Sequence, residues 1–238
     1  MMANRFSEEL DKIARGSRPQ MGFGKYAQAA KPRLFIMAEA SGMVKGTVVP
    51  GVDAVVVAAP CRCEFDKSAI LRGCAVGRET EHTGCDFIVL DLDGSIVDTA
   101  DDMARLFRIC GDLSDGQLRA LGGLDAAAFI AEAELGESLV YRDLLFVQRL
   151  TDLCGKPLLL RLPVIYNKAE LQALWDRGIT GIVVDANKID TAALRNVVDE
   201  LEPKKRGKER AAAIVSNPPP AAAQSTEAEP DLEPDEAE

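Results

Sequence analysis

The sequence predicts one compact α/β domain in which strands and helices alternate around a parallel β-sheet. Three observations lead to this prediction. Apolar residues make up 47% of the 238 residues, enough for a sizeable core. Short, almost continuously apolar runs recur along the chain, which is typical of strands buried on both faces of a parallel sheet. In the second half of the chain these runs alternate with amphipathic helical patterns, as they do in βαβ units.

Six apolar runs predict strands, and two weaker runs extend the set to eight. The six are Leu34–Glu39, Ala54–Ala59, Phe87–Asp91, Ala126–Ala131, Pro157–Leu162 and Gly181–Asp185. The weaker two are Gly73–Gly77 and Arg105–Cys110. Three of the strands are introduced by Gly51, Gly84 and Gly178. A glycine at such a point ends the preceding element in the left-handed conformation, and the similar lead-ins indicate repetition of one βα unit.

The predicted helices are unevenly distributed. Arg5–Arg15 is amphipathic, with Phe6, Leu10 and Ile13 at helical spacing. The later helices are Glu137–Cys154, Lys168–Arg177 and Asp190–Leu201, with shorter ones at Thr99–Phe107 and Ser114–Leu121. The link from Gly77 to Asp86 is shorter than the roughly ten residues that a helical crossover needs. We therefore expect the first half of the sheet to lack helices or to be distorted.

Eight strands in this succession resemble a (β/α)8 barrel of the TIM class. The resemblance lies in the pattern of strands and helices and includes no family signature motif. It implies a small, partly eroded TIM-like barrel, because the repeating stretch of about 170 residues is below the usual size for this fold. The alternative is an open doubly wound parallel sheet. The predicted domains are an N-terminal helix and loop (1–32), the barrel-like domain (33–203) and a tail (204–238).

The tail carries most of the net charge of −10. A basic stretch at 204–210 precedes residues 211–238, which contain seven acidic residues and no Lys or Arg. This segment is rich in Ala and Pro, and it cannot bury enough apolar surface to offset the entropy of ordering. We expect a disordered tail that either solubilises the protein or docks a protein partner.

Composition also excludes several classes of protein. The chain lacks the broad basic surface that nucleic acid requires. It has no apolar run of the roughly 18 residues needed to span a membrane, and residues 1–20 do not form an export signal. We therefore expect a cytoplasmic protein whose six cysteines are free thiols.

Acidic residues at two strand ends predict a metal site. In parallel α/β folds ligands bind beyond the carboxyl ends of the strands. Asp91 and Asp93 lie on one face of the chain at the end of their strand, and Glu132 follows another strand. Carboxylate oxygens suit Mg²⁺ or Mn²⁺, so these three residues are the candidate metal ligands.

Three further strand ends carry candidate ligand-binding residues. Glu39, Arg161 and Asp185 each end or follow a predicted strand. Arg161 would hold an anionic substrate. The other interpretation of these charges is structural: Asp93 and Asp98 cap loops and helices, Arg161 pairs with Asp185 or Glu132, and nothing binds.

Missing motifs narrow the chemistry. The loops Pro163–Asn167 and Ala186–Lys188 contain no glycine, which disfavours the phosphate site of many barrels. Barrel aldolases that use a Schiff base resemble one another in carrying a lysine in the sixth strand, and Ala126–Ala131 has none. A single histidine, His82, excludes mechanisms that need two within one chain.

Three hypotheses about function remain. The first is a non-catalytic or vestigial barrel that acts as a binding or assembly module. It predicts a homodimer that covers apolar surface on the thin first half, with the N-terminal helix contributing. The alternative is a divalent-metal-assisted lyase or hydrolase that acts on a small carboxylate substrate. The third is a regulatory adaptor that works through its tail.

Overall fold

Eight parallel strands close into a barrel in the computed structural model, which describes residues 4–15, 33–40, 49–58, 61–62, 70–75, 82–83, 85–94, 103–110 and 112–203. Around the barrel the strand order is β1-β10-β9-β8-β7-β6-β4-β2. The closed barrel confirms the TIM-like fold, and the open doubly wound sheet is wrong. The strands are β1 (Phe35–Ala40), β2 (Ala54–Ala58), β4 (Leu71–Ala75), β6 (Phe87–Asp91), β7 (Ala104–Cys110), β8 (Ala128–Glu132), β9 (Leu158–Arg161) and β10 (Gly181–Asp185).

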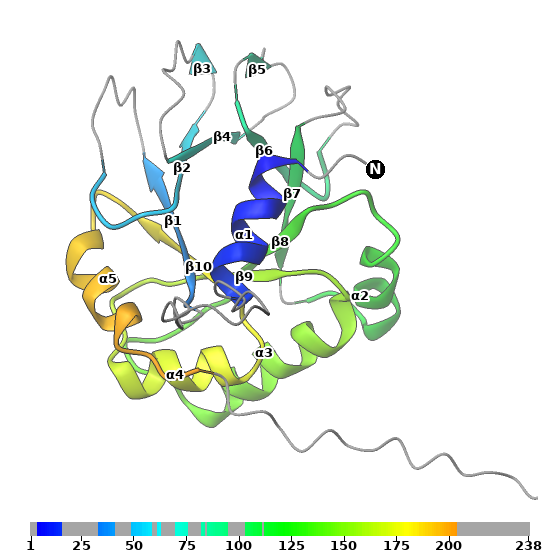
Figure 1. Ribbon diagram of the computed structural model, residues 1–238. Coiled ribbons are helices and arrows are strands. Elements are labelled where there is room, and N and C mark those ends of the chain that lie inside the picture. Colours follow the sequence, from blue (N-terminus) through cyan, green and yellow to red (C-terminus); the bar gives the residue numbers. More distant parts are fainter. Residues whose placement is uncertain are drawn as a thin grey trace, which may run out of the picture. The chain divides into compact units, whose positions relative to one another are not determined.

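The helices surround only part of the barrel. They are α1 (Arg5–Arg15), α2 (Asp115–Leu121), α3 (Tyr141–Cys154), α4 (Lys168–Asp176) and α5 (Thr191–Asp199). Helices α2 to α5 form an arc along one side (Figure 1). Between β1 and β7 the described residues contain no helix, and β3 (Cys61–Arg62) pairs with β5 (His82–Thr83) in a separate two-stranded ladder. The barrel is thus partly eroded in its first half, as the sequence predicts.

All eight predicted strands are present, but one predicted helix is wrong. The pattern at Thr99–Phe107 predicted a helix, and residues 104–107 belong to β7 instead. Ala104 and Leu106 are buried inside the barrel, while Ile109 packs on the outside. This alternation is that of a strand, and pairing with β6 and β8 on both sides overrides the helical pattern.

Two apolar cores lie on opposite faces of the barrel wall. The outer core packs α2 to α5 against the strands, with Trp175, Leu150 and Leu194 on the helices facing Phe129 and Ile182. The inner core fills the barrel with alternate strand residues: Phe35, Met37, Ala54, Val56, Leu71, Phe87, Val89, Ala104, Leu106, Ala128, Ile130, Leu159 and Val183. The interior is therefore packed with side chains, as in other barrels of this class.

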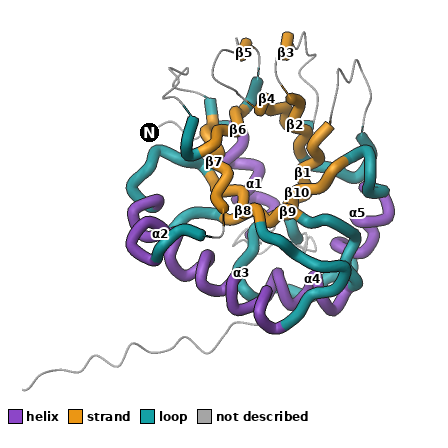
Figure 2. The backbone as a smooth tube through the Cα atoms, turned by 180° about the vertical axis from the view of Figure 1, so that it is seen from behind, coloured by secondary structure: helices purple, strands orange, loops and turns teal. Residues whose placement is uncertain are grey.

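Helix α1 closes one end of this inner core. Phe6 and Leu10, fully buried, belong to the same apolar cluster as the inward-facing strand residues. The ring of Phe6 lies 5.5 Å from that of Phe35 and 4.8 Å from that of Phe87. Arg5 forms an ion pair with Asp86 just before β6. Figure 2 shows the strands as a ring with α1 behind it. The amphipathic face seen in the sequence thus serves as a plug for the barrel.

Two glycines allow close approach between neighbouring strands under the plug. A Cβ atom on Gly73 would lie 2.2 Å from the ring of Phe87, and one on Gly181 would lie 2.8 Å from the carbonyl oxygen of Phe35. Both contacts are too close for a larger residue. Gly73 therefore makes room for the ring of Phe87, and Gly181 allows close approach to the backbone of β1.

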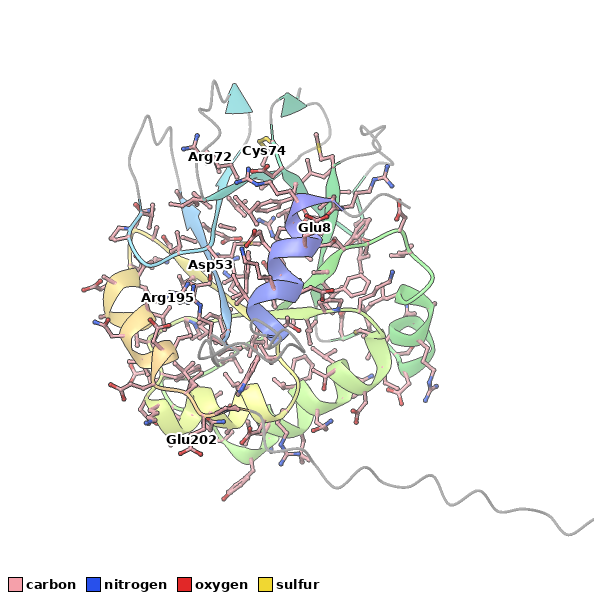
Figure 3. The ribbon with its side chains drawn as sticks, viewed as in Figure 1. Glu8, Asp53, Arg72, Cys74, Arg195 and Glu202 are labelled. Atoms are coloured by element: carbon pink, nitrogen blue, oxygen red, sulfur yellow. A yellow bond between two sulfur atoms is a disulfide. The ribbon has the colours of Figure 1, made fainter. Side chains whose placement is uncertain are left out.

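An ion pair ties α5 to the start of β2 at the same end of the barrel as α1. Arg195 pairs with Asp53, and its Nε donates to the carbonyl of Gly51. Figure 3 shows the two charged side chains close together. Asp53 also accepts a hydrogen bond from the backbone N–H of Ile36 at 2.8 Å. Gly51 and Gly178, which precede predicted strands, have positive φ angles of 77° and 102°, as predicted. Gly84, the third such glycine, lies outside the described residues.

The prediction of six free thiols is wrong at two positions. Cys74 and Cys85 form a disulfide, with their Cα atoms 6.6 Å apart. Residue spacing alone did not indicate this contact, which arises because β4 and β6 are neighbours in the barrel. Cys110 and Cys154 are free, as predicted. The side chains of Cys61 and Cys63 lie outside the described part.

The described residues do not expose the apolar flank on which the homodimer prediction rested. Outer-wall residues of the thin half, including Cys74, Ile88 and Leu90, are buried within the single chain. The homodimer stays a prediction, but exposed apolar surface on this flank no longer supports it. The tail at 204–238 lies outside the described residues. No helix among the residues described is both long enough and apolar enough to cross a membrane.

Candidate functional site

Charged side chains continue the inner core at the end of the barrel opposite α1. Residues at every second strand position face inward. In β1, Phe35 and Met37 fill the interior, and the next residue in the alternation is Glu39. The same step leads from Val89 to Asp91 in β6. The polar end of the barrel thus follows from where the apolar alternation stops in each strand.

Four of these side chains form a closed ring of ion pairs, which we call the mouth ring: Glu39, Arg108, Glu132 and Arg161. Glu39 lies between the two arginines, with one oxygen 3.2 Å from Arg108 Nη2 and the other 2.9 Å from Arg161 Nη2. Glu132 Oε1 lies 2.9 Å from Arg161 Nη1 and 3.6 Å from Arg108 Nε. Positive and negative charges therefore alternate around the ring.

The members of the mouth ring differ in their exposure to solvent. The side chain of Glu39 is 17% exposed and that of Arg108 is 23% exposed, so these two lie deepest. Arg161 is 42% exposed and Glu132 is 34% exposed, so these two form the outer edge. Asp91, 61% exposed, extends the ring outward by pairing with Arg108 at 3.4 Å. A ligand from solution would meet Arg161, Glu132 and Asp91 first.

Asp185 lies at the end of β10 but serves a local turn. Its carboxylate accepts a hydrogen bond from the backbone N–H of Asn187 at 2.9 Å and lies 3.5 Å from Lys188 Nζ. The Asn187 N–H, with help from Lys188, lowers the pKa of Asp185 below its usual value, although partial desolvation opposes this. No ion pair found among the described residues joins Asp185 to the mouth ring. Asp185 thus stabilises the turn after β10, and the pair with Arg161 that the structural interpretation offered as one alternative is not among the ion pairs of the described residues.

Asp93 lies in the turn after β6, where its side chain is exposed, and no ion pair among the described residues joins it to the mouth ring. The charge of Asp93 acts on the nearby thiol of Cys110. Partial burial raises the pKa of the Cys110 thiol, and the carboxylates of Glu132, Asp112, Asp93 and Asp91 raise it further. Cys110 therefore holds its proton at neutral pH and is a poor nucleophile.

Two of the three predicted metal ligands are engaged with arginines. Glu132 contacts both arginines of the mouth ring, and Asp91 contacts Arg108. A divalent cation at Glu132 and Asp91 would compete with these guanidinium groups. No group of three or more His, Cys, Asp or Glu side chains in the part of the chain that the structure describes is arranged to hold a metal. The metal site on Asp91, Asp93 and Glu132 stays a prediction.

Sequence reasoning missed Arg108, which makes more contacts in the mouth than any other side chain discussed above. Its strand, Arg105–Cys110, was only one of the two weaker candidates, and the helix predicted at Thr99–Phe107 overlapped it. The signal was present: Arg108 stands two residues after inward-facing Leu106 and is the register partner of Asp91 in β6. The predicted pair of Arg161 with Glu132 is confirmed.

Comparisons with known proteins bear on the fold alone. The sequence matches no protein-family profile and no curated protein. Among solved structures, the chain is similar to thiamine phosphate pyrophosphorylase from Pyrococcus furiosus at 13% identity and a TM-score of 0.49, over 70% of this chain and 96% of that one. It is also similar to tryptophan synthase from M. tuberculosis (12%, 0.48, over 82% and 98%). A third similarity is to an HpcH/HpaI aldolase from Desulfitobacterium hafniense (11%, 0.46, over 69% and 89%). At these TM-scores the similarities carry no further argument, and the TIM-like fold is assigned from the closed eight-stranded parallel barrel of this chain itself.

Proposed function

We propose that this protein is a non-catalytic binding module whose barrel mouth takes a small carboxylate-bearing ligand at Arg161. One observation carries the proposal. Arg161 presents a partly exposed guanidinium at the mouth, held in one orientation by Glu39 at 2.9 Å and by Glu132 at 2.9 Å. An incoming carboxylate would take the place of one of these glutamates, while the other keeps the guanidinium fixed in advance and so limits the entropy lost on binding.

The chemistry of the described mouth residues supports binding over catalysis. A general acid or base needs a carboxylate or imidazole free to exchange its proton, and Glu39 and Glu132 are both held by arginines. The thiol of Cys110 is protonated at neutral pH because of its raised pKa. These groups can orient a charged ligand but do not form an activated nucleophile.

A ligand screen with matched variants tests this function. Thermal melts of the wild-type protein are recorded with a panel of small carboxylates, and each hit is titrated by calorimetry. We expect saturable binding to the wild type and to Arg142→Gln, an equivalent change on the exposed surface of α3. We expect Arg161→Gln to lose it. Equal binding to Arg161→Gln would refute the assignment of the site, and conversion of a bound hit, followed by NMR, would refute the non-catalytic role.

The metal-assisted lyase or hydrolase remains a second candidate because negative charge exceeds positive charge near Cys110. Four carboxylates raise the pKa of that thiol, and Asp91 is 61% exposed. If this function is correct, Mg²⁺ or Mn²⁺ should raise the melting temperature of the wild type and not that of Asp91→Ala. A wild-type melting temperature that millimolar metal does not change would refute the metal-assisted function.

Assembly is a compatible second property, and it is favoured by apolar side chains at the start of α3. Val140 is 54% exposed, Tyr141 is 86% exposed and Leu145 is 68% exposed. Tyr141 and Leu145 stand four residues apart and share one face of the helix. We propose that a homodimer forms through this face. Light scattering should report a dimer for the wild type and a monomer for the double variant Tyr141→Ser/Leu145→Ser; a monomeric wild type would refute it.

A further inference from the structure

The mouth ring is balanced in charge, and this restricts what can bind there. Two arginines and two glutamates contact one another in alternation. A simple carboxylate that takes Arg161 must displace Glu39 or Glu132, which then keeps only Arg108 as its cation. The loss of one of two charged partners by a partly desolvated carboxylate is costly. A simple anion therefore gains little at this site.

A simple cation meets the opposite difficulty. An amine that approaches Glu132 must displace Arg161 from it, because the two side chains are in direct contact at 2.9 Å. The displaced guanidinium then keeps only Glu39 as its partner and is repelled by the incoming charge and by Arg108, which lies on the other side of Glu132. An ammonium alone thus also costs one ring member one of its two charged contacts.

The outer edge of the ring is where it opens most easily. Arg161 and Glu132 stand on the adjacent strands β9 and β8 and are the most exposed members. Glu39 and Arg108 lie deeper and hold the opposite side of the ring together at 3.2 Å. Asp91 adds a second carboxylate on the exposed rim. Separation of Arg161 from Glu132 leaves the deeper pair intact.

We propose that the ligand is a small zwitterion, with an ammonium and a carboxylate one or two carbons apart, as in an α-amino acid. Its carboxylate takes the place of Glu132 on Arg161, and its ammonium takes the place of Arg161 on Glu132, with Asp91 nearby. Every charge keeps a partner throughout the exchange. Adjacent strands are about 5 Å apart, a span that such a ligand bridges. This inference rests on the proposed function, since it names the ligand class for the same site.

Matched sets of compounds test the proposal on the full chain. Each set contains an amino acid, the same acid without its amine, and the same amine without its carboxylate. Alanine, propionate and ethylamine form one set; leucine, 4-methylpentanoate and 3-methylbutylamine form another. Calorimetry or ligand-detected NMR should find that the wild type binds the amino acid about ten-fold or more tighter than either analogue, the difference expected for one charged contact.

Two variants at the outer edge separate the roles of the two charges. Glu132→Gln should lose the preference for the amino acid and bind the desamino acid more tightly than the wild type does, because the competing carboxylate is gone. Arg161→Gln should bind neither compound. The controls are Glu202→Gln, beyond the end of α5 (Figure 3), and Arg142→Gln on α3, and both should behave as the wild type.

The outcomes distinguish the zwitterion from the broader function. If the desamino acid binds the wild type as tightly as the amino acid, the zwitterion is refuted and the carboxylate-binding function stands. If the amine alone binds most tightly, or if no compound binds saturably up to about 10 mM, a weak affinity by any standard, both proposals are refuted.

Discussion

Replacement of Phe6 by alanine should destabilise the protein by about 3–5 kcal/mol, the range for large-to-small changes at buried aromatic positions. Phe6 is fully buried and packs against the rings of Phe35 and Phe87 at the closed end of the barrel. Pairs of aromatic rings add about 0.5–1.5 kcal/mol beyond the area they bury, which places the expected cost in the upper part of the range. Helix α1 has 11 residues, too few for stability in isolation, so its ordering depends on this contact.

Urea unfolding followed by circular dichroism measures the effect, with Phe6→Leu and Lys12→Ala as controls. The leucine variant retains most of the buried volume and should cost less than about 1.5 kcal/mol. Lys12 is exposed and makes only a surface ion pair with Glu9, so its loss should cost less than about 1 kcal/mol. A loss below about 1 kcal/mol for Phe6→Ala would contradict the plug. If the loss of stability depends on protein concentration, α1 would instead lie in a dimer interface, as predicted from the sequence.

Three further changes test other parts of the fold and the site. Cys74→Ser opens a disulfide that spans 11 residues and should cost about 3 kcal/mol under oxidising conditions; full alkylation of Cys74 in the native, unreduced protein would contradict the bond. Burial and two nearby carboxylates raise the pKa of Tyr166 to about 12, so stability present below about pH 10 should be lost as the pH rises through 12, and alkaline melts of Tyr166→Phe should lack this component. Glu39→Gln removes the carboxylate between two guanidinium groups and should cost about 2–3 kcal/mol, whereas Asp91→Asn at the exposed rim should cost less than about 1 kcal/mol; equal effects in urea unfolding would refute the order of burial in the mouth.

Most of the barrel was predictable because strands buried on both faces leave a strong signal in the sequence. Phe87–Asp91 and Gly181–Asp185 were predicted with their correct bounds. The bounds of α1 were also predicted, but its position was not. An amphipathic pattern establishes that a helix has an apolar face, and it does not identify the surface that the face covers. The structure identifies that surface as the open end of the inner core.

The candidate site was partly predictable for the same reason. Glu39, Glu132 and Arg161 end recognisable strands, and the alternation of side chains placed them at the mouth. Two other residues show where alternation gives less information. Asp93 lies beyond the last residue of β6, where the alternation no longer applies. Asp185 is the last residue of β10, and its carboxylate accepts a hydrogen bond from Asn187 in the following turn. The contact between Cys74 and Cys85 depends on which strands are neighbours, and residue spacing does not contain that information.

The two ends of the inner core explain how an eroded barrel remains closed, and they bear on the proposed selectivity of its mouth. A complete barrel is supported by a helix behind almost every strand, and this one has none in its described residues between β1 and β7. Its interior is instead sealed at one end by the apolar face of α1 and at the other by the mouth ring. If the ring has this structural role, a ligand must replace the contacts it breaks. The same ion pairs that cover the core would then reject single charges and admit a molecule that carries both.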